Sequence, residues 1–212
     1  MVDDAPVVSR RRGRPPATDS ADTRRTIVDN ARRLFAERGY GGVTNKELAE
    51  ASGITTGALY HYVESKLDLY VAVHGDMQRR VYGRFVEAVG ASNTFLGTFE
   101  GMLEAAHAMN VEDHTLALFV GTVRNDMRRF PEVAERLARA DAARDEFFVG
   151  IVDKGIATGE VRPADRDRMV EFMRIMLIGL TEGASETSAK HRCAIDAIRA
   201  LLRGELLRPA AR

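Results

Sequence analysis

The sequence predicts an all-α protein. Of its 212 residues, 45% are hydrophobic and 29% are charged, as in ordinary globular domains. Long runs that alternate apolar and polar residues, the pattern of strands, are absent, whereas apolar residues recur at helical spacing in several segments. Proline is scarce after residue 16 and occurs only as Pro131, Pro163 and Pro209. We therefore expect helices from about residue 23 almost to the end.

Composition also excludes several classes of protein. A single cysteine, Cys193, cannot form an internal disulfide and indicates a cytoplasmic chain. No apolar run approaches 18 residues, so we expect no contact with a membrane. The five histidines show no metal-binding spacing, and no phosphate or dinucleotide loop is present. We expect no metal, no cofactor and no enzymatic activity.

The first helix is expected to begin near Thr23. Ile27, Ala31 and Phe35 form one apolar stripe along it. Gly39 is expected to end it, because glycine best tolerates the left-handed conformation that follows a helix.

Two short helices and a long one are expected next. Thr44 and Glu47 have the spacing of a capping box, which marks a helix start, and this helix should end at Gly53. A second short helix is expected over residues 55–62. A long helix should begin after Ser65 and reach about residue 89.

The remaining helices are separated by glycine, asparagine and proline breaks. They are expected over residues 94–109, 113–127, 131–157, 165–187 and 190–207.

Residues 45–62 have the composition of a DNA-reading helix-turn-helix. Ala49 is small enough for the two helices to approach closely, and Gly53 accepts the positive φ of the turn. The second helix is slim on its outer side.

Four consecutive helical segments also resemble the TetR family of bacterial transcription repressors. The resemblance covers about a quarter of the chain and rests on F-x-E-x-G-Y at 35–40, T-x-x-E-L-A at 44–49, G-I-T-x-G-x-L-Y-x-Y at 53–62 and S-K-x-x-L at 65–69.

This resemblance implies three parts. Residues 1–19 would be a flexible basic arm, and residues 20–66 a three-helix DNA-binding domain. Residues 67–212 would form a larger helical domain for ligand binding and dimerisation. The implied partners are a palindromic operator in double-stranded DNA, a second copy of the chain and a small apolar ligand.

The resemblance also implies contacts with DNA. Thr44 would touch a phosphate, Thr55, Thr56 and Gly57 would lie at the major groove, and Tyr60, His61 and Lys66 would reach phosphates. Alternatives stay open, because Tyr60 can be a core aromatic residue and His61 and Lys66 ordinary surface residues. No side chain here is a strong base-specific reader.

An arginine-rich segment precedes the first helix. Arg12 and Arg14 flank a glycine, as in short segments that lie in narrow A·T-rich minor grooves. The alternative is a basic tail that attracts phosphates without regard to sequence.

The last two helices are expected to form the dimer interface. Residues 169–180 are apolar on nearly every side and must be covered on both, although burial within one chain is the alternative. The interface residues expected are Met176, Leu180, Ala194, Ala197, Ile198 and Leu201.

A ligand cavity is expected among the middle helices, since Met and Phe adapt to varied apolar ligands. Such residues are also ordinary core residues. The candidates are Met102, Phe119, Phe148 and Met173. Polar candidates, among which the sequence does not choose, are His74, His107, Arg124 and Asn125.

The function expected is a ligand-responsive repressor that the ligand releases from its operator. The alternative within DNA binding is an architectural or activating protein that senses nothing. An alternative from another class is a helical enzyme or carrier with an incidental helix-turn-helix pattern.

Overall fold

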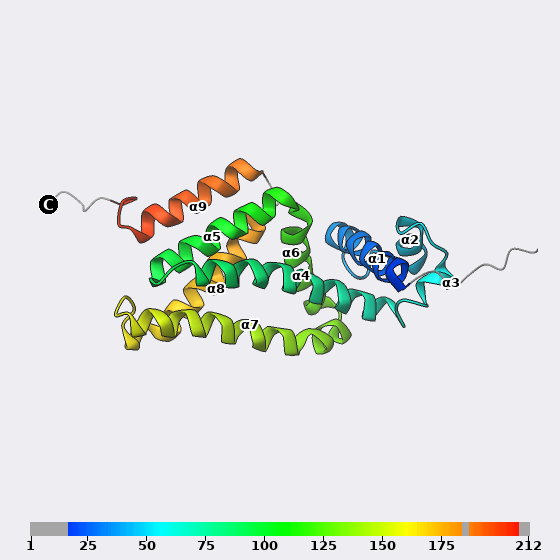
Figure 1. Ribbon diagram of the computed structural model, residues 1–212, viewed down its shortest axis with the longest axis horizontal. Helices are drawn as coiled ribbons and strands as arrows, with labels where there is room; N and C mark the ends of the chain where they lie inside the picture. Colours follow the sequence, from blue (N-terminus) through cyan, green and yellow to red (C-terminus); the bar gives the residue numbers. More distant parts are fainter. Residues whose placement is uncertain (1–16, 184–186, 208–212) are drawn as a thin grey trace, which may run out of the picture.

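The computed structural model describes residues 17–183 and 187–207, and these form α-helices and one short 3-10 turn. A small bundle of α1–α3 occupies one end of an elongated molecule, a larger bundle occupies the other, and α4 extends through both (Figure 1). The all-α prediction is confirmed. The elements are α1 Ala17–Arg38, α2 Asn45–Ala51, α3 Thr56–Leu59, α4 Lys66–Gly90, α5 Phe95–Glu112, α6 His114–Arg129, α7 Pro131–Ala157, η1 Pro163–Asp165, α8 Arg166–Gly183 and α9 Ser188–Leu202.

The apolar stripe of α1 forms the core of the small bundle. Ile27 and Phe35 are almost fully buried, and Leu48 of α2 and Leu59 of α3 pack in the same cluster. Gly39 ends α1 with a φ of 71°, the left-handed conformation expected there.

The larger bundle has a core of its own, built from α4, α5, α7, α8 and α9. Phe99, Met102, Met173 and Ile195 are fully buried in it. The core of α1–α3 continues into Tyr70 of α4, Phe119 of α6 and Leu137 of α7, so apolar packing also fills the junction between the two bundles.

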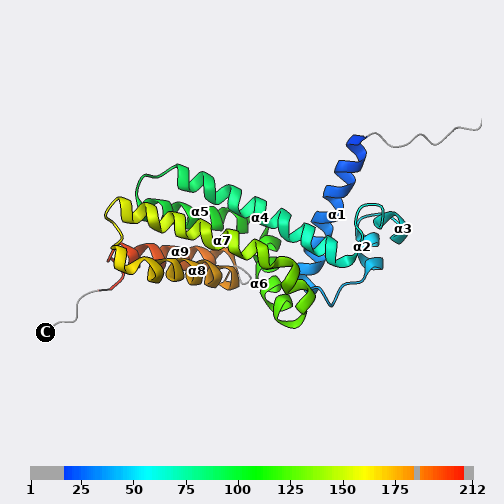
Figure 2. The ribbon, with the colours of Figure 1, turned by 90° about the horizontal axis from the view of Figure 1, so that it is seen from below.

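Helix α6 lies at that junction (Figure 2). Its Asp126 is 3% exposed and accepts two hydrogen bonds, each 2.8 Å long, from the backbone N–H of Tyr40 and the hydroxyl of Tyr70. Burial, followed by the bond to Asp126, raises the pKa of Tyr70, so its hydroxyl stays protonated and donates. One carboxylate of α6 therefore holds both the turn after α1 and helix α4.

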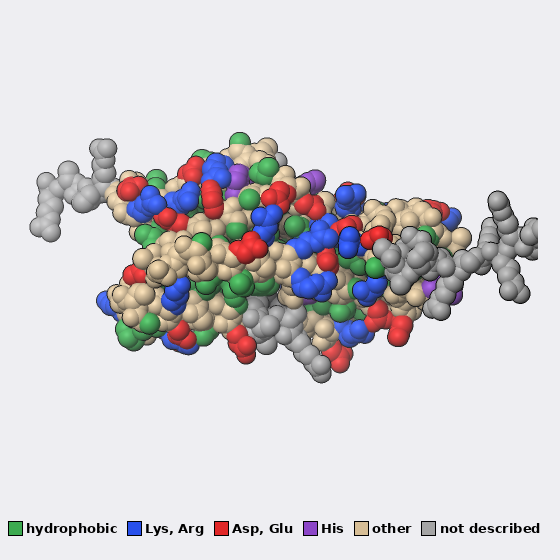
Figure 3. All heavy atoms as spheres, in the orientation of Figure 1, with side chains coloured by type: hydrophobic (Ala, Val, Ile, Leu, Met, Phe, Trp, Pro, Cys, Tyr) green, Lys and Arg blue, Asp and Glu red, His purple; other side chains and the backbone are tan. Residues whose placement is uncertain are grey.

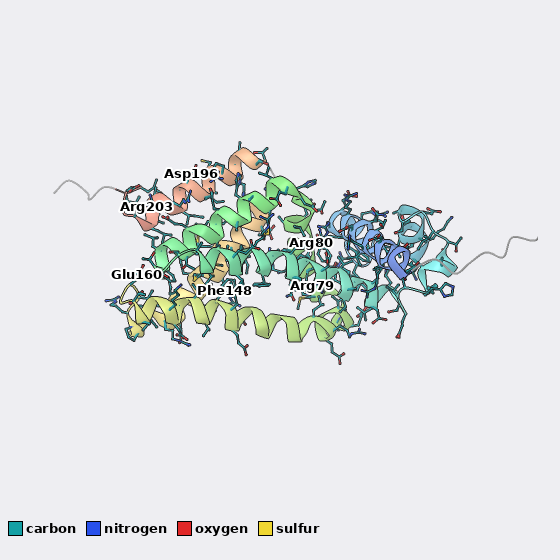
Figure 4. All side chains as sticks on the ribbon, in the orientation of Figure 1. Arg79, Arg80, Phe148, Glu160, Asp196 and Arg203 are labelled. Atoms are coloured by element: carbon teal, nitrogen blue, oxygen red, sulfur yellow. The ribbon has the colours of Figure 1, made fainter. Side chains whose placement is uncertain are left out.

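Ion pairs make a second link between the bundles. Arg32 of α1 is 2% exposed, and its guanidinium contacts Asp29 at 3.1 Å and Asp113, the N-cap residue of α6, at 2.8 Å. Arg80 of α4 contacts Asp29 at 2.7 Å and Asp76 at 2.8 Å (Figure 4). Helix α1 is thus tied to both α4 and α6.

The structure differs from several of the expected boundaries. Helix α3 ends at Leu59 and not at residue 62, and helix α9 ends at Leu202 and not at residue 207. Helix α1 begins at Ala17 and not near Thr23, so residues 17–19 are helical and not part of an arm. Helix α8 ends at Gly183, before residue 187. Arg12 and Arg14 lie outside the described residues, and within those residues no helix is long and apolar enough to cross a membrane.

Replacing Asp126 tests the junction. Asp126→Asn keeps the size but removes the charge that strengthens both hydrogen bonds, and such bonds contribute about 1.5–3 kcal/mol each. We expect the free energy of unfolding to fall by about 2–4 kcal/mol and the melting temperature by roughly 5–15 °C. Asp167→Asn, at a side chain that is 97% exposed, is the control and should change little. Equal melting temperatures for Asp126→Asn and wild type would contradict the role of this carboxylate.

Candidate DNA-binding site and ligand cavity

Helices α2 and α3 form the predicted helix-turn-helix. The capping box is present, since the Thr44 hydroxyl accepts from the N–H of Glu47 at 3.3 Å and the Glu47 carboxylate accepts from the N–H of Thr44 at 2.8 Å. Gly53 makes the turn with a φ of 68°. Thr55 then caps α3 by accepting from the N–H of Ala58 at 3.1 Å. Each helix start is therefore fixed by a local side chain.

The outer face of this motif is open to solvent. Thr44, Thr55, Gly57 and His61 are exposed, and Thr56 is partly buried. A Cβ added at Gly57 would have no neighbour closer than 3.9 Å, so the protein itself does not require glycine there. Figure 1 shows α3 at the far end of the small bundle, away from the larger one.

Tyr60 lies beside this face. Its side chain is 50% exposed, and its hydroxyl accepts from the side-chain amide of Asn45 at 2.8 Å. The alternative that Tyr60 is a core aromatic residue does not fit this exposure. The bond joins α2 to the end of α3 and orients the ring on the outer surface.

Lys66 has a structural role that the sequence did not indicate. Its ammonium donates to the carbonyls of Tyr40 and Val43, each at 2.9 Å, and lies 4.4 Å from the centre of the Tyr40 ring. Burial lowers its pKa, and the carboxylate of Asp126 opposes that shift. Two of its three N–H groups are thus engaged within the chain, and one is left for the phosphate contact that the sequence predicts.

The larger bundle encloses a cavity of about 490 Å³, within the range of small-molecule sites. Of the four expected apolar residues, Phe148 lines it and points inward from α7 (Figure 4). Met102, Phe119 and Met173 are fully buried in the packed cores and do not line it. Other apolar lining residues include Met77, Val81, Phe85, Met109, Leu116, Val120, Val123, Met127, Leu177, Ile178 and Leu180.

Polar side chains interrupt this apolar wall. His74 and Arg124, two of the polar candidates, line the cavity, whereas His107 and Asn125 do not. Asn110 and Arg174 also line it and were not expected. Helical spacing in the sequence marks a face of each helix but not the neighbour that the face meets, so nothing in the sequence singled these two out.

Two histidines meet at the edge of the cavity. His107 of α5 and His191 of α9 have Nδ1 atoms 3.0 Å apart and nearly parallel rings. Burial lowers the pKa of both, which favours the neutral pair in which one ring donates to the other. The two residues are 84 positions apart, so only the fold reveals the pair. Among the described residues no three potential metal ligands come together.

The six expected dimer residues divide into three groups. Leu180 and Ile198 are buried within the chain itself, at 5% and 8% exposed. Ala194 and Leu201 are exposed, and Met176 and Ala197 are partly buried. Hydrophobic side chains also lie at the surface along α9 (Figure 3). Ile175, Gly179 and Cys193 of α8 and α9 are exposed as well.

Comparison with known proteins gives one consistent result. Residues 27–73 match the family model described as bacterial regulatory proteins, tetR family. The transcriptional repressor KstR2 of Rhodococcus jostii (strain RHA1) is 27% identical over 165 residues, which cover 76% of this chain and 80% of KstR2. The solved structure of GusR from Salmonella enterica aligns with a TM-score of 0.68 and 22% identity, over 91% of this chain and 99% of GusR. The structure of AibR in complex with isovaleryl coenzyme A and operator DNA aligns with a TM-score of 0.69 and 17% identity, over 84% of this chain and 97% of AibR.

The capping box makes a pH-dependent contribution to stability. Hydrogen bonds from the Thr44 side chain and backbone, with the Arg38 guanidinium, lower the pKa of Glu47 from 4.5 to about 2. A carboxyl whose pKa is lowered by folding stabilises the fold above its ordinary pKa, and this stabilisation is lost as the pH falls toward the folded value. Glu47→Gln should therefore have a lower melting temperature than wild type at neutral pH. The difference between the two melting temperatures should become smaller between about pH 5 and pH 3.

Thermal unfolding followed by circular dichroism measures this difference. Glu50→Gln, on the same helix but 3.8 Å from its partner Lys46, is the matched control and should show a small difference at every pH. If the difference in melting temperature between Glu47→Gln and wild type stays constant over this pH range, the role assigned to the Glu47 carboxylate is disproved.

Proposed function

The chain belongs to the TetR family of bacterial regulatory proteins, and from this premise we propose that it is a transcription repressor controlled by a small molecule. It binds a palindromic operator in double-stranded DNA as a homodimer, and a ligand in the cavity of the larger bundle releases it. The observation that carries this proposal is helix α6, which lines the cavity and also holds the DNA-binding bundle through Asp126. Such a protein acts on DNA in the cytoplasm and catalyses no reaction.

Helix α3 is the reading element of this proposal. Its exposed Thr55 and Gly57 have little bulk, so the helix can lie deep in the major groove with its backbone close to the bases. Tyr60 and His61 then face the sugar–phosphate backbone, as does Thr44 from α2. Specificity of this kind relies on apolar contacts and on DNA shape more than on bidentate hydrogen bonds.

Lys66 contributes to DNA binding in two ways. It fixes the turn between α1 and α2 through the carbonyls of Tyr40 and Val43, which sets where Thr44 points. Its remaining N–H is available to a phosphate. Arg12 and Arg14 extend the contact into the minor groove.

The homodimer uses the outer surfaces of α8 and α9. Exposed Ile175, Ala194 and Leu201 are apolar, and a second copy of the chain covers them in the proposed dimer. A two-fold dimer presents two copies of α3 to successive major grooves, and this pairing requires a palindromic site.

Ligand release follows from the two roles of α6. Val123 and Met127 line the cavity, and between them Asp126 holds the turn after α1 and helix α4. A ligand that prefers a shifted position of α6 favours a conformer in which the two α3 helices are wrongly spaced. The alternative, a DNA-binding protein that senses nothing, leaves the cavity without a role.

Gly57→Ala separates DNA binding from folding. The added methyl group meets open space in the protein, and alanine favours a helix over glycine by about 0.5–1 kcal/mol, so the variant should be at least as stable as wild type. On the proposed docking the methyl group meets DNA, and affinity for an operator selected in vitro should fall about tenfold or more, equivalent to about 1.4 kcal/mol.

Gly83→Ala on α4, also in open space, is the matched control. It should raise stability similarly and leave operator affinity unchanged in fluorescence anisotropy. Unchanged operator affinity for Gly57→Ala would refute the proposed placement of α3.

Leu201→Glu tests the dimer. Its side chain is 46% exposed in the single chain, so the charge is tolerated there, but an interface would bury it at a cost of several kcal/mol. We expect a monomer by analytical ultracentrifugation and loss of operator binding. Val86→Glu, at another exposed apolar residue, should remain dimeric. A wild-type chain that sediments as a monomer at micromolar concentration would rule out the proposed dimer.

A further inference from the structure

The cavity wall is mostly apolar but includes three guanidinium groups. Arg124 and Arg128 of α6 and Arg174 of α8 belong to the lining, and no aspartate or glutamate does among the described residues that line it. A cavity for a wholly apolar ligand gains nothing from guanidinium groups, because a charge held beside an apolar ligand loses hydration without compensation. The wall therefore suits a ligand with a polar or charged group, and not the purely apolar ligand that the sequence suggested.

Two of these arginines retain unused hydrogen-bond donors. Arg124 pairs through Nη2 with Glu182, yet its Nη1 is buried and has no hydrogen-bond partner. Arg174 pairs through Nη2 with Glu171 at 2.5 Å, yet its Nε is buried and has none either. An unsatisfied buried donor costs about 1–3 kcal/mol, and more on a charged group. An acceptor brought by a ligand would remove this cost.

Asn110 is an independent sign of a polar ligand group. Its side chain belongs to the cavity lining and is 5% exposed, and its Oδ1 atom has no hydrogen-bond partner. It lies on α5, whereas Arg124 and Arg174 lie on α6 and α8. The three residues that carry these unpaired atoms thus line one cavity from three different helices.

We propose that the cavity binds an amphipathic anion, with an apolar body against Phe85, Met109 and Phe148 and a carboxylate or phosphate head on the guanidinium groups of Arg124 and Arg174. This inference rests on the proposed function only in taking the cavity as the sensor site. Arginine suits such a head because its fork of N–H groups binds carboxylate and phosphate in a bidentate manner. Where the apolar body of the ligand carries a hydrogen-bond donor, Asn110 accepts a hydrogen bond from it.

The size of the cavity sets the probe. One water occupies about 30 Å³ in the liquid and a methylene group a similar space, so a ten-carbon chain needs about 300 Å³. The cavity of about 490 Å³ accommodates that chain and a head group. Decanoate, decyl phosphate and decanol share one apolar body and differ only in the head.

The first measurement needs no variant. Isothermal titration calorimetry of the full chain with the three probes should show at least one of the two anions binding tenfold or more tighter than decanol. The ratio between decanoate and decyl phosphate identifies the preferred head. Decanol binding as tightly as both anions would overturn the proposal, and so would the absence of binding by both anions.

The second measurement assigns the head to its arginines. Arg124→Met and Arg174→Met keep the apolar stems and remove the charge. Each should weaken the preferred anion about tenfold and leave decanol binding unchanged. Arg168→Met, at a side chain that is 83% exposed and paired with Asp165, is the matched control and should leave both unchanged. Arg124→Lys, which keeps the charge but not the fork, should be intermediate and guards against a folding defect in the methionine variant.

Operator release is measured separately. If the anion binds with the expected dependence on arginine but leaves operator affinity unaltered, the amphipathic anion site stands and ligand release fails. If anion and decanol bind equally and both release DNA, ligand release stands and the anion site fails.

Discussion

The structure depends most on one buried carboxylate. Asp126 lies at the junction of the two bundles, beside an apolar cluster that joins α1–α3 to α4, α6 and α7, and it accepts hydrogen bonds from the backbone N–H of Tyr40 and the hydroxyl of Tyr70. Buried rings of Phe35, Tyr70 and Phe119 pack at the same junction, and the two hydrogen bonds to one charged group add direction and register to that packing. The position of α1–α3 relative to the rest therefore depends on the positions of both α6 and α4.

This constraint connects recognition to the cavity. Gly39 approaches the same carboxylate so closely that an added Cβ would lie 3.0 Å from an oxygen of Asp126. Tyr40 follows Gly39 directly. The carbonyls of Tyr40 and Val43 both accept hydrogen bonds from the ammonium of Lys66. Thr44, which starts the helix-turn-helix, follows directly. A displacement of α6 is thus transmitted through hydrogen bonds to the start of α2, with Arg32 and Asp113 as a parallel link.

The sequence predicted features that depend on local chemistry. The capping box of Thr44, the left-handed Gly39 and Gly53 and the start of α7 at Pro131 were all expected and are present, since each needs only a few neighbouring residues. Residues 17–19 were missed because their helix has no apolar stripe at that end.

The cavity was predicted less well for a physical reason. Met102 and Phe119 have the same character as Phe148, yet only Phe148 faces open space. Which helix face meets a gap is decided by how several helices pack, and hydrophobic spacing contains no record of that. The same holds for the donors of Lys66 and for the pair of His107 and His191, each of which joins distant segments.

Helix α8 contributes both to the cavity wall and to the outer surface, and it therefore connects the two. Arg174, Leu177 and Ile178 of this helix line the cavity, while Ile175 and Gly179 on its other side are exposed. A ligand head that draws Arg174 inward acts on the same helix that the proposed dimer buries. The salt bridge from Arg124 to Glu182 also joins α6 to α8, so the two helices respond together. In the proposed dimer, ligand binding would alter the spacing of the two α3 helices by two routes, through α6 within one chain and through α8 at the contact between chains.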